Sequence, residues 1–189
     1  MRPCSIRFGP SFPINLTSRN LSGYTKMKLL CFLAALLTNS VSIALEPPSF
    51  SNLATHESES LENYTDDGKW LIVMIWASDC IACNNDARSY SDLHTRHKNG
   101  NASVLGLSID GDIKREEAIA FTKWHEISFP NLIGNPDAVE SYYAQLTHTA
   151  WVGTPSFLIF NPQGTLEAKQ AGAIPAELLE QFLNQHANN

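Results

Sequence analysis

The 189-residue sequence contains no internal repeat, no heptad pattern and no low-complexity tract. These absences exclude solenoids, coiled coils and intrinsically disordered proteins as classes. Hydrophobic residues make up 43% of the chain and charged residues 17%, which is typical of a globular protein. The length fits one ordinary domain rather than two.

Acidic residues are absent from the first 44 positions, although the chain has 19 of them. Met27 opens a short apolar run at 29–37, and the small residues Ser42 and Ala44 occupy positions −3 and −1 of a potential cleavage site. This order predicts a secretory signal peptide that is cut after Ala44, so the protein is expected in the periplasm or another exported compartment. An uncleaved membrane anchor is the less favoured alternative, because a spanning helix needs about 20 apolar residues.

Residues 1–26 are interpreted as sequence upstream of a true start at Met27, or else as a long basic start of the leader. Beyond residue 44 there are 8 basic and 19 acidic residues, a net charge of −11 compared with −6 for the whole chain. Such an acidic surface argues against nucleic acid or an anionic membrane as a partner. Cys4 and Cys31 would leave with the leader, so the exported protein would keep two of its four cysteines.

The part after residue 44 predicts alternating strands and helices. Residues 45–68 are expected to form an irregular lead-in to a domain at 69–189. The run at 70–76 is continuously apolar, as in a strand buried on both faces. Further strands are predicted at 103–109, 129–133, 156–160 and 165–170, and helices from the remaining cysteines to about 97 and at 115–125, 137–145 and 175–186. This order predicts an α/β fold with a mixed central sheet flanked by helices on both faces.

Several aromatic and histidine residues have two possible interpretations. Phe121 and Trp124 lie at helical spacing and are expected to face the core. Trp76 and Trp151 could line the rim of a site or could simply be core residues. His148 is expected to be a solvated loop residue.

The two remaining cysteines, Cys80 and Cys83, form a C-x-x-C motif between the predicted buried strand and a helix. A cysteine at a helix N-terminus meets free N–H groups and the positive end of the helix dipole, which favour the thiolate. The thiolate is the nucleophile in disulfide exchange, so Cys80 is placed to attack a disulfide. The two-residue spacing lets Cys83 resolve the resulting mixed disulfide.

Residues 76–83, with the sequence W-A-S-D-C-I-A-C, resemble the W-A-x-x-C-x-x-C segment of thioredoxin-like proteins. The strand and helix at 104–125 and the segment 154–159 resemble the TlpA/ResA-like periplasmic branch, and the resemblance extends over about 70–185. It implies a thioredoxin-like fold with a βα insertion and a redox-active Cys80–Cys83 disulfide without any other cofactor.

The same resemblance implies protein clients with thiols or disulfides, and an upstream electron donor in the membrane. It also implies a cis peptide bond between Thr154 and Pro155 that faces the cysteines. In the family, the residue before this proline offers its backbone to an extended substrate, so Thr154 and Pro155 are expected to bind the client. Read without the resemblance, Pro155 would be a proline at the start of a strand.

Residues around the cysteines depart from the family pattern and are expected to tune the redox potential. Asp79 stands where the family usually has Trp, and its charge should disfavour the thiolate and make the protein a better reductant. Replacing Asp79 with Trp should therefore raise the potential. Ile81 and Ala82 replace the usual proline-containing centre and do not fix the potential. Met74 occupies the place of a buried acid, which leaves the proton acceptor of Cys83 unassigned.

Three other functions are weaker fits to the sequence. His94 and His97 complete a C-x2-C-x10-H-x2-H spacing that is close to a zinc finger, but on one helix Cys80 and His94 would be roughly 21 Å apart. A structural disulfide across two residues would stabilise little. A peroxiredoxin needs a Pro and a Thr or Ser ahead of a lone cysteine, which residues 75–79 lack. The sequence thus predicts an exported reductase of client disulfides, with a dithiol oxidase or isomerase, or a copper- or zinc-binding protein without redox turnover, as alternatives.

Overall fold

The apolar run at 70–76 forms strand β3 (Trp70–Trp76) in the middle of the sheet. The computed structural model describes residues 48–65 and 67–186. All seven side chains of β3 are buried and alternate between two cores. Met74 and Trp76 face one core, whereas Val73 and Ile75 face the other.

The sheet is mixed, as predicted, and its seven strands have the order β2-β1-β5-β4-β3-β6-β7. Strand β3 is parallel to β4 and antiparallel to β6; β4 is also parallel to β5, and β6 is antiparallel to β7. The other strands are β1 (Phe50–Asn52), β2 (Ser58–Glu59), β4 (Ala102–Ser108), β5 (Asn131–Ile133), β6 (Ser156–Phe160) and β7 (Leu166–Ala171).

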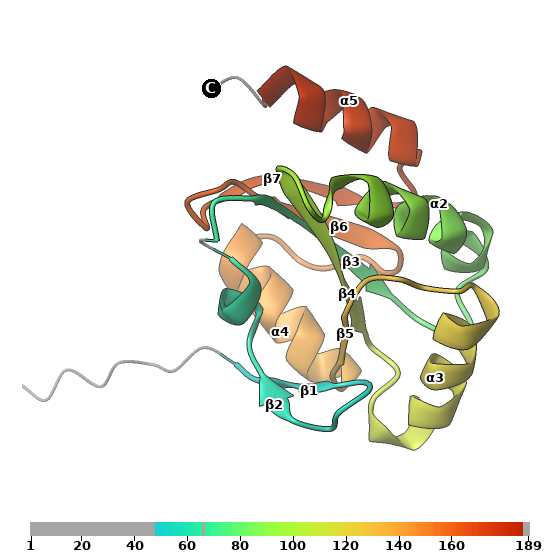
Figure 1. The fold of residues 1–189 in the computed structure, drawn as a ribbon. Helices are drawn as coiled ribbons and strands as arrows, with labels where there is room; N and C mark the ends of the chain where they lie inside the picture. The colour runs from blue at the N-terminus through green and yellow to red at the C-terminus, as the bar shows by residue number, and fades with distance from the viewer. Residues whose placement is uncertain (1–47, 66, 187–189) are drawn as a thin grey trace, which may run out of the picture. The chain divides into compact units, whose positions relative to one another are not determined.

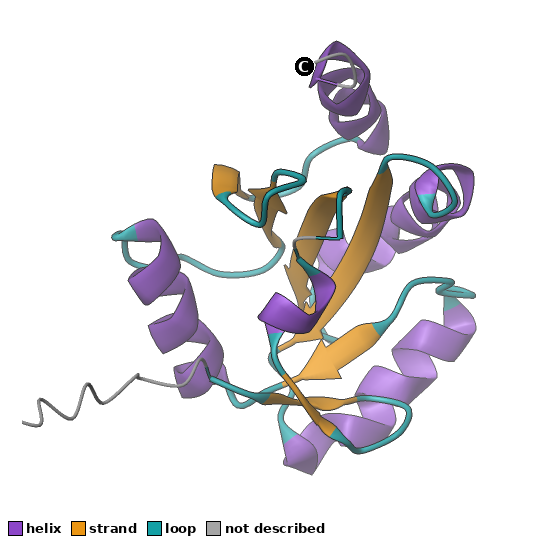
Figure 2. Ribbon diagram, turned by 60° about the vertical axis from the view of Figure 1, so that its left-hand side comes forward, coloured by secondary structure: helices purple, strands orange, loops and turns teal. Residues whose placement is uncertain are grey.

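Four α-helices cover the two faces of the sheet in the described part of the chain (Figures 1 and 2). They are α2 (Ile81–His97), α3 (Arg115–Trp124), α4 (Pro136–Thr147) and α5 (Ala176–His186), with 3-10 turns at η1 (Leu61–Tyr64) and η2 (Asp112–Lys114). Helices α2, α3 and α5 pack on the face that carries Trp76, and α4 packs with η1 on the opposite face. The predicted α/β architecture, a mixed sheet with helices on both faces, is therefore confirmed, and the predicted inserted unit corresponds to β4 with α3.

The segment 45–68, expected to be an irregular lead-in, contains three short regular elements, β1, β2 and η1. Strand β1 pairs with β5 on one side and with the edge strand β2 on the other, and the side chain of Arg115 donates a hydrogen bond to Ser51 Oγ (2.9 Å). Leu61 of η1 is buried in the core beneath α4. Strands of two or three residues have no periodicity of their own, so only their partners reveal them.

The predicted leader, with its apolar core at 29–37 and its cut after Ala44, lies outside the described residues. Across 48–65 and 67–186, none of the helices has the length and hydrophobicity needed to cross a membrane.

Candidate active site

Cys80 and Cys83 are joined by a disulfide, with their Cα atoms 5.2 Å apart. Cys80 is the N-cap residue of α2, and its Sγ accepts a hydrogen bond from the backbone N–H of Cys83 (3.1 Å). Cys80 is half-buried, whereas Cys83 has 0% exposure. The helix N-terminus therefore contacts the sulfur that a substrate can reach, as the motif predicted.

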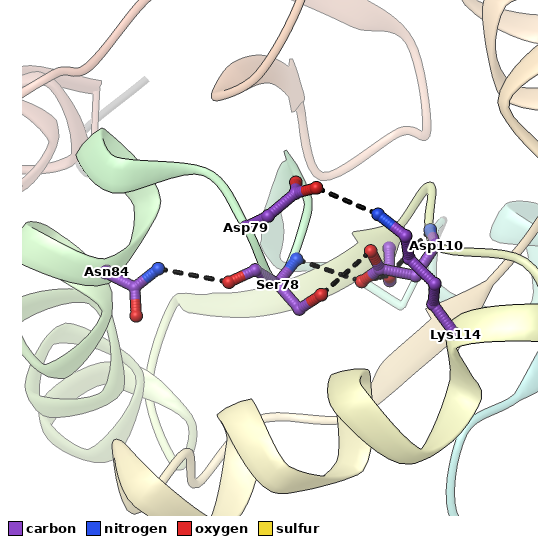
Figure 3. A network of polar contacts seen from close by, with 6 residues as sticks. Ser78, Asp79, Asn84, Asp110 and Lys114 are labelled. Carbon is purple, nitrogen blue, oxygen red and sulfur yellow. Dashed lines mark hydrogen bonds and ion pairs between the residues drawn. The ribbon is translucent and has the colours of Figure 1, made fainter.

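The loop between β3 and the disulfide is held by a carboxylate from the neighbouring strand. Asp110 accepts hydrogen bonds from the backbone N–H and the hydroxyl of Ser78, both at 3.0 Å (Figure 3). It also accepts one from the hydroxyl of Ser108 at 2.7 Å. Asp110 follows β4, whose carboxyl end lies beside that of β3 because the two strands are parallel. These contacts fix the start of the cysteine loop.

Asn84, directly after Cys83, fixes the other side of that loop. Its amide nitrogen donates to the carbonyl oxygens of Ser78 (3.2 Å) and Cys80 (2.9 Å), as Figure 3 shows for Ser78. Its carbonyl oxygen therefore accepts from Nε2 of His125 (3.0 Å), which assigns the proton to that nitrogen. Burial, and secondarily Arg88, lowers the pKa of His125, so the imidazole is neutral near pH 7.

Asp79 forms an ion pair with Lys114 of η2, with Oδ2 and Nζ 2.8 Å apart (Figure 3). The hydrogen bond from Lys114 lowers the pKa of Asp79, and both side chains are exposed. The charge of Asp79 is therefore offset by a paired cation, and the expected effect of Asp79 on the thiolate stays a prediction. Of the other two predicted tuning residues, Ile81 is 80% exposed and Ala82 is half-buried.

The peptide bond between Thr154 and Pro155 is cis. Ser156 is paired with Ile75 in the β3–β6 register, so the loop that contains Pro155 lies at the edge of the sheet from which the cysteine loop departs. The carbonyl oxygen of Pro155 accepts a hydrogen bond from Gly172 (2.9 Å). Thr154 is half-buried and Pro155 is buried, and their contact with a client stays a prediction.

Trp76 and Trp151 take the core alternative, whereas Trp124 differs from expectation. Trp76 is buried and donates from Nε1 to Asn131 Oδ1 (3.0 Å), and Trp151 packs against the α4-side core. Trp124, which was expected in the core, is 81% exposed. At 3.6 residues per turn it lies about 120° around α3 from the buried Ala118, so it falls outside the buried stripe.

The zinc-finger spacing does not assemble a shared site. His94 Nδ1 accepts a hydrogen bond from the backbone N–H of Val104 (3.1 Å), and His97 Nε2 is 2.9 Å from Glu180. No group of three or more His, Cys, Asp or Glu side chains that could hold a metal ion occurs within 48–65 and 67–186.

His94 makes stability depend on pH. Burial, followed by Lys98 and Lys69, lowers its pKa below the usual 6.5. The unfolded chain therefore takes up this proton first as the pH falls, and the free energy of unfolding should decrease below about pH 6.5. His94→Asn keeps an acceptor for Val104 and does not titrate, so thermal denaturation should show a smaller loss of Tm between about pH 7 and pH 5.

His148, exposed at the end of α4, provides the matched control. Between about pH 7 and pH 5, the Tm of His148→Asn should fall by as much as the Tm of the wild type. An unchanged pH dependence in His94→Asn would contradict the role of His94.

Comparison with known proteins gives a family and a fold. The AhpC/TSA family matches residues 44–169, whereas no curated protein matches the chain. Among solved structures, the chain is similar to the thioredoxin domain of a thiol-disulfide oxidoreductase from Bacteroides vulgatus, with 19% identity, a TM-score of 0.59, and 72% of this chain and 93% of that one covered. A DsbF homologue from Corynebacterium diphtheriae has 19% identity and a TM-score of 0.62, with 73% and 83% covered.

A secreted disulfide oxidoreductase of Mycobacterium tuberculosis, homologous to E. coli DsbE, has 18% identity and a TM-score of 0.56, with 73% and 95% covered. At these identities the likeness establishes the thioredoxin-like fold, and the family match covers most of the chain. The chain belongs to the AhpC/TSA family, as a thioredoxin-fold protein that carries the C-x-x-C disulfide of a thiol–disulfide oxidoreductase.

Proposed function

We propose that the protein is an exported reductase of disulfide bonds in client proteins, with Cys80 as the nucleophile and Cys83 as the resolving residue. The observation that carries this proposal is the asymmetry of the pair: Cys80 is partly exposed at the N-terminus of α2, and Cys83 is buried behind it. An attacking sulfur needs access to the client, whereas a resolving sulfur needs access only to its partner.

In the reducing direction, the thiolate of Cys80 attacks a client disulfide, and one client sulfur leaves as a thiolate that takes up a proton. The thiolate of Cys83 then attacks Cys80 Sγ, which forms the Cys80–Cys83 disulfide and releases the second client thiol. The client gains two electrons and two protons, and a dithiol donor, proposed to lie in the membrane, returns them to the protein. The backbone of Thr154 beside Pro155 is proposed to hold the client segment against Cys80.

Export is supported by the leader pattern and by a similar structure, and the reducing direction is supported by the contacts of Cys80 and Lys114. The basic, apolar and small-residue order before residue 45 fits a leader, and one of the similar structures is of a secreted protein. Strong oxidants stabilise their reduced form, but the hydrogen bond that reaches Cys80 Sγ here comes from a neutral backbone N–H, and Lys114 is engaged by Asp79.

The equilibrium redox potential of the purified protein against glutathione tests the direction. We expect a value well below the roughly −120 mV of strong periplasmic oxidants and closer to about −270 mV, the value of thioredoxin. A potential near −120 mV would assign the protein to the oxidases instead.

Asp79 and Lys114 should shift that potential in opposite directions. Lys114→Met leaves Asp79 unpaired beside Cys80, which disfavours the thiolate and should make the potential more negative. Asp79→Asn leaves Lys114 without its partner and should make the redox potential less negative. The double variant should return close to the wild-type value, and both shifts should shrink in about 1 M salt. If the wild type, both single variants and the double variant have equal potentials, the Asp79–Lys114 pair does not affect the redox potential of the disulfide.

A further inference from the structure

A hollow of about 480 Å³ lies directly beside the cysteine loop, on the side of α3. Ser78 and Asp79 line it from the loop, and Glu117, Phe121 and Trp124 line it from α3. In the strand order β4–β3–β6, the inserted unit β4–α3 and the loop of Pro155 lie on opposite sides of β3. The hollow is therefore a second surface next to the disulfide, separate from the Thr154–Pro155 loop.

Trp124, which lines the hollow, is one of the few large apolar side chains that are exposed, and most of the others adjoin site residues in the sequence. Among the described residues, the exposed large hydrophobic side chains are Ile81, Ile113, Trp124, Val152 and Leu178. Ile81 lies between the cysteines, Val152 precedes the Pro155 loop, and Ile113 adjoins Lys114, which contacts Asp79. Leu178, on α5, is the exception. Exposed apolar side chains that cluster mark interaction surfaces, and tryptophan is among the commonest residues to anchor a partner.

The base of the hollow is preorganised. Phe121 is buried and stacks on Trp76, with ring centroids 4.3 Å apart. The ring of His125 packs on Phe121 at 4.5 Å and is hydrogen-bonded to Asn84. A rigid aromatic base loses little conformational entropy when it receives an apolar side chain.

The rim of the hollow is acidic. Asp79 and Glu117 line it, and both raise the pKa of Lys114, Asp79 more strongly. Lys114 pairs with Asp79 at 2.8 Å and offsets its charge, whereas Glu117 makes no salt bridge to another described residue and supplies the negative charge of the rim. A partner with a basic side chain would therefore complement the rim.

We propose that this hollow is a specificity site for the client and that it receives an extended client segment in which an apolar or aromatic side chain and a Lys or Arg lie close to the reactive cysteine. This inference rests on the proposed disulfide exchange and adds the substrate class to it. Helix α3 then selects the client, while the Thr154–Pro155 loop holds its backbone without regard to sequence.

Two synthetic peptides, each with one cysteine in a mixed disulfide with glutathione, provide the test. In the first, Phe and Lys flank the cysteine; in the second, Gly and Ser take their places. The kcat/KM for reduction of each peptide is measured by titration of the released thiol, and the ratio of the two values is the readout. The wild type should favour the Phe/Lys peptide, and Trp124→Ala should lower the ratio about fivefold to tenfold.

Glu117→Lys should lower the same ratio, because it replaces attraction of the basic side chain with repulsion. Leu178→Ala removes an equally apolar exposed side chain from α5 and should keep the wild-type ratio. The inference is overturned if Trp124→Ala and Glu117→Lys both keep the wild-type ratio, or if the wild type does not discriminate between the peptides. If the wild type reduces neither peptide, the proposed function itself fails.

Discussion

Cys80→Ala is expected to abolish reduction of a protein disulfide, lowering the rate by at least about 10³-fold, because within 48–65 and 67–186 Cys80 is the cysteine that a client can reach. In the described chain the other cysteine is Cys83, which is fully buried behind the disulfide and cannot meet a client directly. Insulin disulfide reduction with a dithiol donor measures the loss.

Cys83→Ala is the informative counterpart. The variant keeps the nucleophile at the N-terminus of α2 but lacks the resolving sulfur, so the mixed disulfide between Cys80 and the client should accumulate. Non-reducing electrophoresis and mass spectrometry would identify the adduct. Accumulation of the adduct on Cys83 in the Cys80→Ala variant, with none in Cys83→Ala, would reverse the two roles.

Gly106→Ala should cost the largest amount of stability for a single added methyl group. A Cβ at this position of β4 would lie 1.8 Å from Asn131 Oδ1 and 2.8 Å from Trp76 Nε1. Asn131 cannot move away cheaply, because its amide also donates to the carbonyl oxygen of Phe129 (2.9 Å). Overpacking and the loss of the Trp76–Asn131 hydrogen bond together should lower the free energy of unfolding by about 2–4 kcal/mol.

Thermal denaturation should therefore show a Tm lower by roughly 10 °C. Gly100→Ala is the matched control, since a Cβ there would meet only the carbonyl oxygen of His97 at 3.4 Å at an exposed position. A Gly106→Ala protein as stable as Gly100→Ala would show that the Trp76–Asn131 contact is not needed behind the active-site strand.

The fold could be predicted because short, continuous stretches of the sequence identify its central elements. The uninterrupted apolar run of β3, the C-x-x-C after it and the turn before residues 165–170 each have a recognisable pattern. The short strands β1 and β2 could not be found in this way, because they depend on pairing with β5 and with each other.

The site was predicted only in part, for the same reason. Cys80 and Cys83 are neighbours in sequence, whereas Asp110, Lys114 and His125 reach the cysteine loop from the segment after β4. The contact of Ser78 with Asp110 had a usable signal, since polar residues that follow adjacent parallel strands meet at one edge of the sheet. Lys114 and His125 had none, because their approach to the cysteine loop depends on how η2 and α3 pack against it.

The carboxylate of Asp110 has a consequence for the reaction cycle. It connects the carboxyl ends of β3 and β4 by two hydrogen bonds from Ser78 and one from Ser108. None of these three hydrogen bonds involves a sulfur atom. Cleavage of the bond between Cys80 and Cys83 therefore leaves these three hydrogen bonds in place. The oxidised and reduced proteins should share nearly the same backbone, so each turnover exchanges electrons without the cost of rebuilding the loop.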